Sequence, residues 1–262
     1  MTQRLPVDTV LLPVQPDPVV YFERFGGLLS AAETSRFQRF RHDGAASLFI
    51  AGRALVRTEL AKRTGCSPDE LQLACSQKGR PLATAPAAAT GWSFSISHTP
   101  GWAGIAIARH PDSAADTPVD GGALLGFDLQ KTTPNNDLPA VAKRVYSTTE
   151  LRDLAAIGEV LTAPWLRRFF TLWTAKEAWI KARGAGFSLP PKLATFAMSP
   201  PQTNSDMPAV AMSSCDPEAR ENPADWTFSC WSAAPAICAA VATNYPHWLT
   251  VSRLPCALSA PR

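Results

Sequence analysis

Three side chains that can take part in chemistry recur at helical spacing between Trp165 and Arg183. Trp173, Glu177 and Lys181 follow one another at i, i+4 and i+8, so on a helix they project from nearly the same side. The simplest interpretation of the helix alone is an exposed Glu177–Lys181 ion pair beside a half-buried tryptophan, which stabilises a helix by about 0.3–0.5 kcal/mol. The apolar stripe predicted for this helix consists of other residues, namely Leu172, Ala175, Trp179 and Ala182.

A second group of polar side chains lies in the segment GFDLQ, which precedes Lys131. If this segment is a strand, alternation places Asp128 and Gln130 on one face of the sheet. Magnesium prefers oxygen ligands, and proteins usually supply one or two carboxylates while phosphates and water complete the shell. Asp128 and Glu177 are therefore candidate ligands, with Gln130 as an uncharged third. The alternative for Asp128 is an aspartate that caps a turn at the end of the strand.

The elements that must position these residues are predicted from apolar periodicity and from turn residues. We expect helices from Leu29 to Arg41 with Ser30 as N-cap, from about Ala45 to Arg63 with Gly65 as terminator, and from Trp165 to Arg183 with Gly184 as C-cap. We expect strands at Thr9 to Val14 and Ala123 to Gln130, a hairpin at Trp92 to Ala108, a cationic turn at Lys78 to Pro81, and a long mobile connection at Pro200 to Pro223.

The chain also aligns with itself. Residues Trp226 to Asn244 match Trp92 to His110 without gaps and share one Trp, one Phe, one Ser and two Ala, which indicates two related halves, although a match this short can also arise by chance. The positions of Ser97 and His98 are held in the second copy by Trp231 and Ser232. We therefore expect Ser97 and His98 to belong to a site and their counterparts to the scaffold.

Composition restricts the classes of function. A net charge of +3 is small for a duplex nucleic-acid binder, and the 6 cysteines lack the spacing of a zinc or redox motif. A local cluster of arginines can either bind a small anion or form a solvated helix face; its members are Arg36, Arg39, Arg41, Arg53 and Arg57.

The first ten residues show no signal peptide, and no apolar run is long enough to cross a membrane. We expect a cytoplasmic monomer without nucleic-acid or membrane partners.

Five motifs, taken in chain order, resemble the 4'-phosphopantetheinyl transferases of the type that activates surfactin synthetase. They are KGRP at Lys78 to Pro81, FSISH at Phe94 to His98, GFDLQ at Gly126 to Gln130, YSTTEL at Tyr146 to Leu151 and WTAKEAWIKARGAGFSLP at Trp173 to Pro190. The resemblance implies an α+β fold of two pseudo-symmetric halves, each an antiparallel sheet packed with helices, with the active site at their interface. It divides the chain into residues 1–125, which contact the 3'-phosphate and adenine of the donor, and residues 126–262, which carry the metal and the catalytic helix.

The resemblance also implies roles for individual residues. Coenzyme A is the donor, magnesium is the cofactor, and an apo acyl or peptidyl carrier protein is the acceptor. Asp128 and Glu177 would bind the metal, with Gln130 in a place where the family usually has an acidic ligand. Catalytic roles fall on Glu150, as an aid to deprotonation of the acceptor serine, and on Glu177 and Lys181. Coenzyme A contacts fall on Arg36, Arg80, Ser97, His98, Lys176 and Lys181.

Two other functions are compatible with the sequence. The neutral Gln130 leaves open a coenzyme A binding protein of the same fold with reduced or lost transferase activity, although Asp128, Glu150, Glu177 and Lys181 are retained. A different nucleotide-dependent enzyme is the weaker alternative, because the chain has neither a GxxxxGK[ST] loop nor a GxGxxG fingerprint after a strand.

Overall fold

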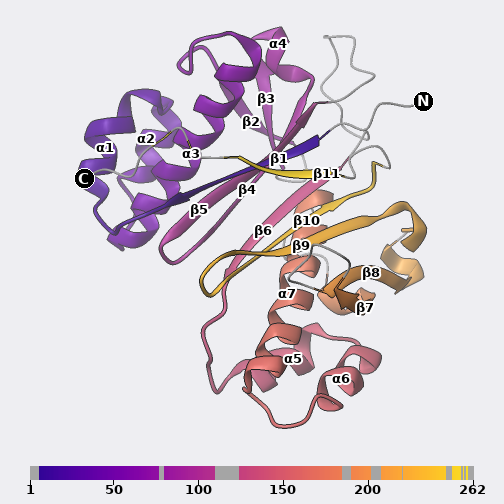
Figure 1. Ribbon diagram of the computed structural model, residues 1–262. Helices are drawn as coiled ribbons and strands as arrows, with labels where there is room; N and C mark the ends of the chain where they lie inside the picture. The colour runs from indigo at the N-terminus through magenta and orange to yellow at the C-terminus, as the bar shows by residue number, and fades with distance from the viewer. Residues whose placement is uncertain are drawn as a thin grey trace. The chain divides into compact units, whose positions relative to one another are not determined.

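The computed structural model describes residues 6–76, 80–109, 124–184, 190–201, 208–219, 221–245, 250–254, 256 and 258 (Figure 1). The chain divides into a first unit, residues 1–123 with 248–262, and a second unit, residues 124–247. The predicted division at residue 125 lies close to the observed one, but the assignment of residues 248–262 to the C-terminal half differs from the structure. The reason is β11 (Thr250–Leu254), which pairs in parallel with β1 (Pro6–Pro13) and so joins the sheet of the first unit.

The sheet of the first unit has the order β11-β1-β5-β4. Its hairpin consists of β4 (Trp92–Thr99) and β5 (Trp102–Arg109), as predicted, and β5 also pairs antiparallel with β1. The remaining elements are α1 (Pro18–Phe25), α2 (Ala31–Phe37), α3 (Asp43–Thr64), the short α4 (Ala87–Thr90), and the separate pair β2 (Gln72–Cys75) and β3 (Pro81–Ala85).

The helix ends of this unit follow from local chemistry. The Ser30 side chain accepts from the Glu33 amide and the Glu33 carboxylate accepts from the Ser30 amide, so a capping box starts α2 at the predicted N-cap. Gly65 ends α3 in the left-handed conformation with φ 72°, also as predicted. Helix α3 packs its apolar side chains against β4 and β5, where Phe94 and Ile105 are buried in the same cluster.

The second unit is built around the three-stranded antiparallel sheet β6-β10-β9. Its strands are β6 (Leu125–Lys131), β9 (Thr227–Ala234) and β10 (Ile237–Thr243), and the other elements are α5 (Leu138–Val145), α6 (Thr148–Ala155), α7 (Ala163–Arg183) and the hairpin of β7 (Ala194–Pro201) and β8 (Pro208–Cys215). The prediction of one irregular connection from Pro200 to Pro223 is therefore wrong for residues 208–215. Strand β8 alternates buried Val210 and Met212 with less buried neighbours, and this alternation outweighs the turn-forming composition around it.

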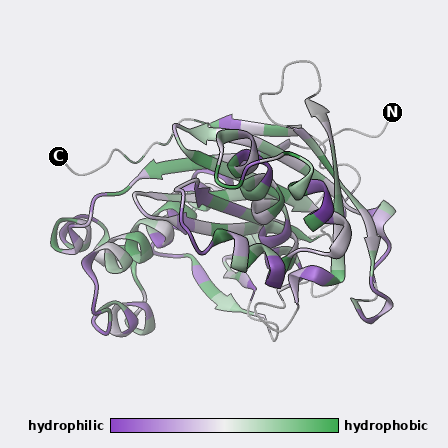
Figure 2. Ribbon diagram, turned by 90° about the horizontal axis from the view of Figure 1, so that it is seen from below, coloured by the Kyte–Doolittle hydropathy of each residue, from purple (hydrophilic) through white to green (hydrophobic). Residues whose placement is uncertain are grey.

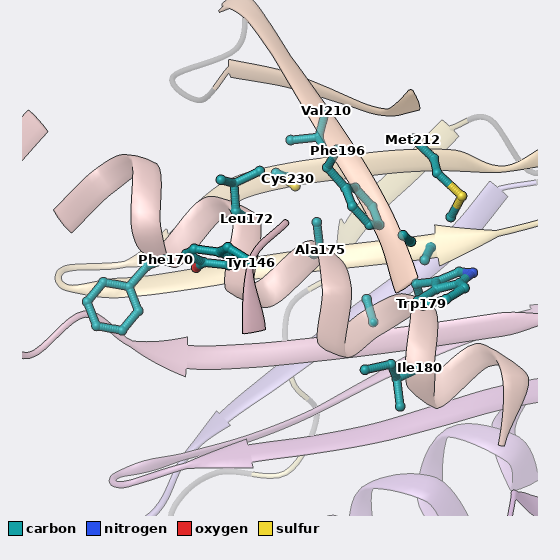
Figure 3. Packing of buried hydrophobic residues seen from close by; sticks show 14 of the residues in the cluster. Tyr146, Phe170, Leu172, Ala175, Trp179, Ile180, Phe196, Val210, Met212 and Cys230 are labelled. Carbon is teal, nitrogen blue, oxygen red and sulfur yellow. The ribbon is translucent and has the colours of Figure 1, made fainter. Parts of the chain in front are cut away.

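Helix α7 carries the core of the second unit (Figure 3). Leu172, Ala175 and Trp179 are fully buried, as the predicted apolar stripe requires, and they pack between the sheet and the β7–β8 hairpin, which contributes Phe196 and Met212. Gly184 ends the helix in the left-handed conformation. The helices described here mix hydrophobic and hydrophilic positions (Figure 2), and none of them has the length and apolar character needed to cross a membrane.

The two units repeat one order of elements. In each unit a first strand is followed by three α-helices, of which the last is longest, and then by two β-hairpins, the second of which supplies an inner strand of the sheet. The first unit has in addition the short α4 between its hairpins and β11 after them. The self-alignment of the sequence superimposes β4 and β5 on β9 and β10, apart from single-residue differences at strand ends and a bulge next to Ile237. The α+β class with two related halves is thus confirmed, whereas the location of the active site at their interface stays a prediction.

Candidate active site

A group of three charged side chains joins β6 to α7. Lys181 Nζ lies 2.6 Å from Asp128 Oδ1, and both side chains interact electrostatically with Glu177 one helical turn before Lys181. The Asp128 side chain is only 7% exposed, whereas that of Lys181 is 32% exposed. The structure therefore differs from the simple surface pair of Glu177 and Lys181, because the ammonium of Lys181 contacts Asp128 on β6.

Gly126 explains how a helix can approach this strand so closely. A Cβ atom at this position would lie 1.9 Å from the carbonyl oxygen of Ala178 and 2.5 Å from the backbone nitrogen of Ala182. Only glycine permits this contact. Because Asp128 stands two residues after Gly126, it projects from the same face of β6 toward α7.

The environment of Glu177 disfavours its negative charge. Burial and, after it, the nearby charge of Asp128 raise the pKa of Glu177 above its ordinary value, and the Lys181 ammonium offsets this rise only in part. A divalent cation stabilises two carboxylates whose negative charges repel each other in a partly buried place. Asp128 and Glu177 therefore fit a magnesium ion.

The donor set supplied by the protein is small. Within the described ranges, no group of three or more His, Cys, Asp and Glu side chains is arranged to hold a metal. Alternation on β6 places Gln130 on the same face as Asp128, but its Nε2 donates to the carbonyl oxygen of Lys131 at 3.3 Å. A magnesium ion on Asp128 and Glu177 would thus depend on substrate oxygens and water for most of its shell.

Glu150 and Lys176 form a different, fully buried ion pair. Lys176 Nζ lies 3.0 Å from Glu150 Oε2, and the two side chains are 2% and 0% exposed. The other partners of the carboxylate are backbone amides: Ser147 N donates to Oε2 at 2.8 Å, and Phe196 N donates to Oε1 at 2.8 Å. Lys176 Nζ also donates to the carbonyl oxygens of Pro191 and Ala194.

This pair has a structural role in the described structure. It ties the start of α6 and the middle of α7 to the first residues of β7, and so fixes the rotation of the helix that presents Glu177 and Lys181. Burial lowers the pKa of Lys176, and the charge of Glu150 opposes that effect. The predicted contacts of Glu150 with the acceptor serine and of Lys176 with coenzyme A conflict with this burial, because both side chains already use their polar atoms inside the protein.

The first unit holds a cluster of cations on α2 and α3. The guanidinium carbons of Arg36 and Arg53 lie 5.1 and 5.5 Å from the ring centroid of Phe49. Arg53 also lies close enough to Cys75, at the end of β2, for the thiol to affect its pKa. Burial lowers the pKa of Arg53, and the positive charges of Arg36 and Arg57 act in the same direction.

Glu33 organises this cluster and was missed in the sequence. Its Oε1 lies 3.1 Å from Arg53 Nε, and its Oε2 lies 2.8 Å from Arg57 NH2. Burial would raise the pKa of Glu33, but the Ser30 amide and the two guanidinium groups lower it below the ordinary value. The Glu33 carboxylate thus pairs with both Arg53 and Arg57, and the exposed Arg36 lies beside them. Only Ser30 was predicted, as the N-cap of this helix, and the arginine partners of Glu33 come from a different helix.

The other predicted donor contacts lie directly before β3 and on β4. Lys78 lies outside the described residues. Arg80 is half-buried and exchanges two hydrogen bonds with Ser76: Ser76 N donates to Arg80 O at 2.8 Å, and Arg80 N donates to Ser76 Oγ at 3.1 Å. On β4, Ser97 is buried and His98 is exposed, and their side chains leave the strand on opposite faces. A ligand on one face of the sheet therefore meets the side chain of one of them, not both.

Both units match models of one family. Residues 124–242 match the 4'-phosphopantetheinyl transferase superfamily, and residues 17–110 match the N-terminal part of 4'-phosphopantetheinyl transferases. The chain belongs to the 4'-phosphopantetheinyl transferase superfamily. The family expected from the five motifs is thereby confirmed, and each of the two matches falls within one structural unit.

Individual relatives agree with this membership. A phosphopantetheinyl transferase of Thraustochytrium sp. is 29% identical over 174 residues, which cover 65% of this chain and 57% of that protein. A 4'-phosphopantetheinyl transferase of Bacillus subtilis is 30% identical over 168 residues, covering 64% of this chain and 66% of that protein. An L-aminoadipate-semialdehyde dehydrogenase-phosphopantetheinyl transferase of Mus musculus is 25% identical over 203 residues, covering 75% and 60%. The chain thus spans less than two thirds of the length of each of these relatives.

Proposed function

We propose that this chain transfers the 4'-phosphopantetheine group of coenzyme A to a serine hydroxyl of an apo acyl or peptidyl carrier protein and releases adenosine 3',5'-bisphosphate. The observation that carries the proposal is the convergence of Asp128, Glu177 and Lys181 where α7 meets β6. Family membership supports the same activity.

The chemistry suits such a cluster. Displacement at a phosphate requires positioning and neutralisation of charge more than covalent participation by the protein. Asp128 and Glu177 would hold magnesium, which when bound supplies positive charge to the pyrophosphate. The Lys181 ammonium, on a flexible and partly exposed side chain, adds a second cation that can reach phosphate oxygens.

The transfer forms one bond, breaks one bond and releases one proton. The serine oxygen bonds to the phosphorus nearer the pantetheine, and the bond from that phosphorus to the bridging oxygen breaks. Adenosine 3',5'-bisphosphate leaves with the electron pair, and the serine proton needs an acceptor. We assign this proton to a water molecule near the site instead of Glu150, because the carboxylate of Glu150 is fully enclosed and Glu177 would be bound to magnesium.

In the first unit, we assign Arg80, His98 and Arg36 to the 3'-phosphate of the donor. Support comes from the exposed imidazole of His98 and from the excess of guanidinium groups over carboxylates around Phe49. Arginines bind phosphate oxygens strongly because they offer several donors in a fixed plane.

The test is direct. The protein is incubated with coenzyme A, magnesium and a panel of apo carrier proteins, and the products are weighed by mass spectrometry. We expect at least one carrier to gain the mass of one phosphopantetheine, with an equal amount of adenosine 3',5'-bisphosphate. Measurable binding of coenzyme A without a mass gain on any carrier would favour a binding protein that has lost the transfer step.

A further inference from the structure

The contact between Lys181 and Asp128 places a cation of the protein on a proposed metal ligand. Lys181 Nζ lies 2.6 Å from Asp128 Oδ1, which is the distance of a strong charge-assisted hydrogen bond. Asp128 is almost fully buried on β6, whereas the lysine side chain extends from the last turn of α7 and is 32% exposed. The aspartate is thus enclosed, whereas the lysine side chain reaches solvent on a long and flexible stem.

An ammonium in this position opposes a divalent ion for two reasons. It occupies an oxygen that a metal would need, and its charge reduces the attraction of the two carboxylates for any second cation. Asp128, Glu177 and Lys181 together carry one net negative charge when all three are ionised. Magnesium gives up its water ligands reluctantly, so a site of this charge binds it weakly without further oxygens.

A bound diphosphate changes this balance. It brings negative oxygens that can accept from Lys181 Nζ in place of Asp128 Oδ1, and it offers the same class of oxygen to magnesium. When the lysine moves, both carboxylates become available together. The lysine has a long and flexible stem with three donors, so this exchange of partners needs no movement of the backbone.

We propose that Lys181 holds the carboxylate pair Asp128 and Glu177 closed to divalent cations until a diphosphate binds, and that its ammonium then passes from Asp128 to the phosphate oxygens. This inference rests on the proposed function, which supplies the diphosphate of coenzyme A. It assigns Lys181 a second role as the residue that couples metal binding to donor binding. Binding of either ligand then strengthens binding of the other by the same factor.

The experiment measures metal binding without turnover. Mn²⁺, which prefers the same oxygen ligands as Mg²⁺, is titrated against the full chain, and free Mn²⁺ is read by electron paramagnetic resonance with and without coenzyme A. The proteins are the parent, Lys181→Met, Lys181→Arg, Lys131→Met and Asp128→Asn. Lys131→Met removes a charge from the same strand three residues beyond Asp128 and controls for loss of positive charge at a distance. Thermal unfolding shows that each variant is folded.

We expect Lys181→Met to bind Mn²⁺ on the order of tenfold more tightly than the parent without coenzyme A, and to show a smaller enhancement by coenzyme A than the parent, because only the oxygens that the diphosphate offers to the metal then contribute. Lys181→Arg should keep the coupling, and Lys131→Met should change the Mn²⁺ affinity much less than Lys181→Met.

The inference is overturned if Lys181→Met binds Mn²⁺ no more tightly than the parent or than Lys131→Met. That result leaves the proposed function intact as long as the parent binds Mn²⁺ with coenzyme A and Asp128→Asn does not. Absence of Mn²⁺ binding by every protein, even with coenzyme A, would overturn the metal site of the proposed function as well.

Discussion

Gly126 on β6 stands so close to α7 that a Cβ atom there would lie 1.9 Å from the carbonyl oxygen of Ala178. Since real Cβ atoms do not approach backbone oxygens to that distance, a larger residue must push the helix away from the strand. The same helix carries Glu177 and Lys181, and the same strand carries Asp128. The glycine therefore sets the separation of the groups to which we assign the chemistry.

Gly126→Ala should both destabilise the protein and separate Lys181 from Asp128. Overpacking of a tight contact costs about 1–3 kcal/mol in the free energy of unfolding, and transfer should fall further than stability explains. Urea unfolding and transfer rates measure the two effects. Gly27→Ala is the matched control, because a Cβ atom at Gly27 meets nothing within 4 Å. Equal stability of Gly126→Ala and Gly27→Ala would show that α7 is not in contact with the strand as described.

Removing one member of the buried pair Glu150 and Lys176 should cost mainly stability. Glu150→Ala leaves the Lys176 ammonium in the core without its carboxylate, which costs about 3–5 kcal/mol in the free energy of unfolding. A double variant, Glu150→Leu with Lys176→Met, removes both charges and should recover much of that loss. Chemical denaturation measures all three proteins. Should Glu150→Ala unfold like the parent and yet lose transfer, Glu150 would have the catalytic role that the sequence suggested.

The raised pKa of Glu177 predicts how stability depends on pH. The folded protein holds a proton on Glu177 at pH values where the unfolded chain has already lost it, so this group makes the free energy of unfolding fall as pH rises above 4.5. Glu177→Gln should equal the parent in stability below that pH and exceed it at pH 7. Denaturation of both proteins across this range, without divalent cations, gives the difference. If the difference in the free energy of unfolding between the two proteins does not change with pH, the raised pKa of Glu177 in the folded protein is contradicted.

Arg80 and His98 are assigned to a phosphate that is remote from the bond that breaks. Their replacement by alanine should therefore weaken binding of coenzyme A more than binding of dephospho-coenzyme A, which lacks the 3'-phosphate. Calorimetric titration of each variant with both donors measures the two affinities. Arg24→Ala, which removes an exposed arginine from α1 and lies outside the arginine cluster of α2 and α3, is the control. An equal loss of affinity for both donors would contradict the assignment.

Local signals in the sequence were sufficient for many elements. The N-cap at Ser30, the terminal glycines at positions 65 and 184, and the hairpin β4–β5 were predicted because each depends on residues that are near one another in the chain. The face of α7 that bears Glu177 and Lys181 was predicted for the same reason, since helical spacing alone defines it.

Long-range partners were not predictable in the same way. Helix spacing suggested that Lys181 pairs with Glu177, whereas Lys181 Nζ donates to Asp128, which is 53 residues away in the sequence. The YSTTEL motif suggested a role of Glu150 toward the acceptor serine, but the burial of Glu150 depends on Lys176 and on the Phe196 amide, which only the packed structure brings there. Strand β8 was missed because its short alternation lies among turn-forming residues.

The central claim is that Asp128, Glu177 and Lys181 perform phosphopantetheine transfer, and mass spectrometry of an apo carrier protein tests it most directly. The parent, Asp128→Asn, Glu177→Gln and the control Asp137→Asn, which changes an exposed aspartate before α5, are each incubated with coenzyme A and magnesium. We expect the parent and Asp137→Asn to add one phosphopantetheine per carrier, and Asp128→Asn and Glu177→Gln to add almost none while remaining folded. Transfer by both Asp128→Asn and Glu177→Gln at the rate of the parent would contradict the account.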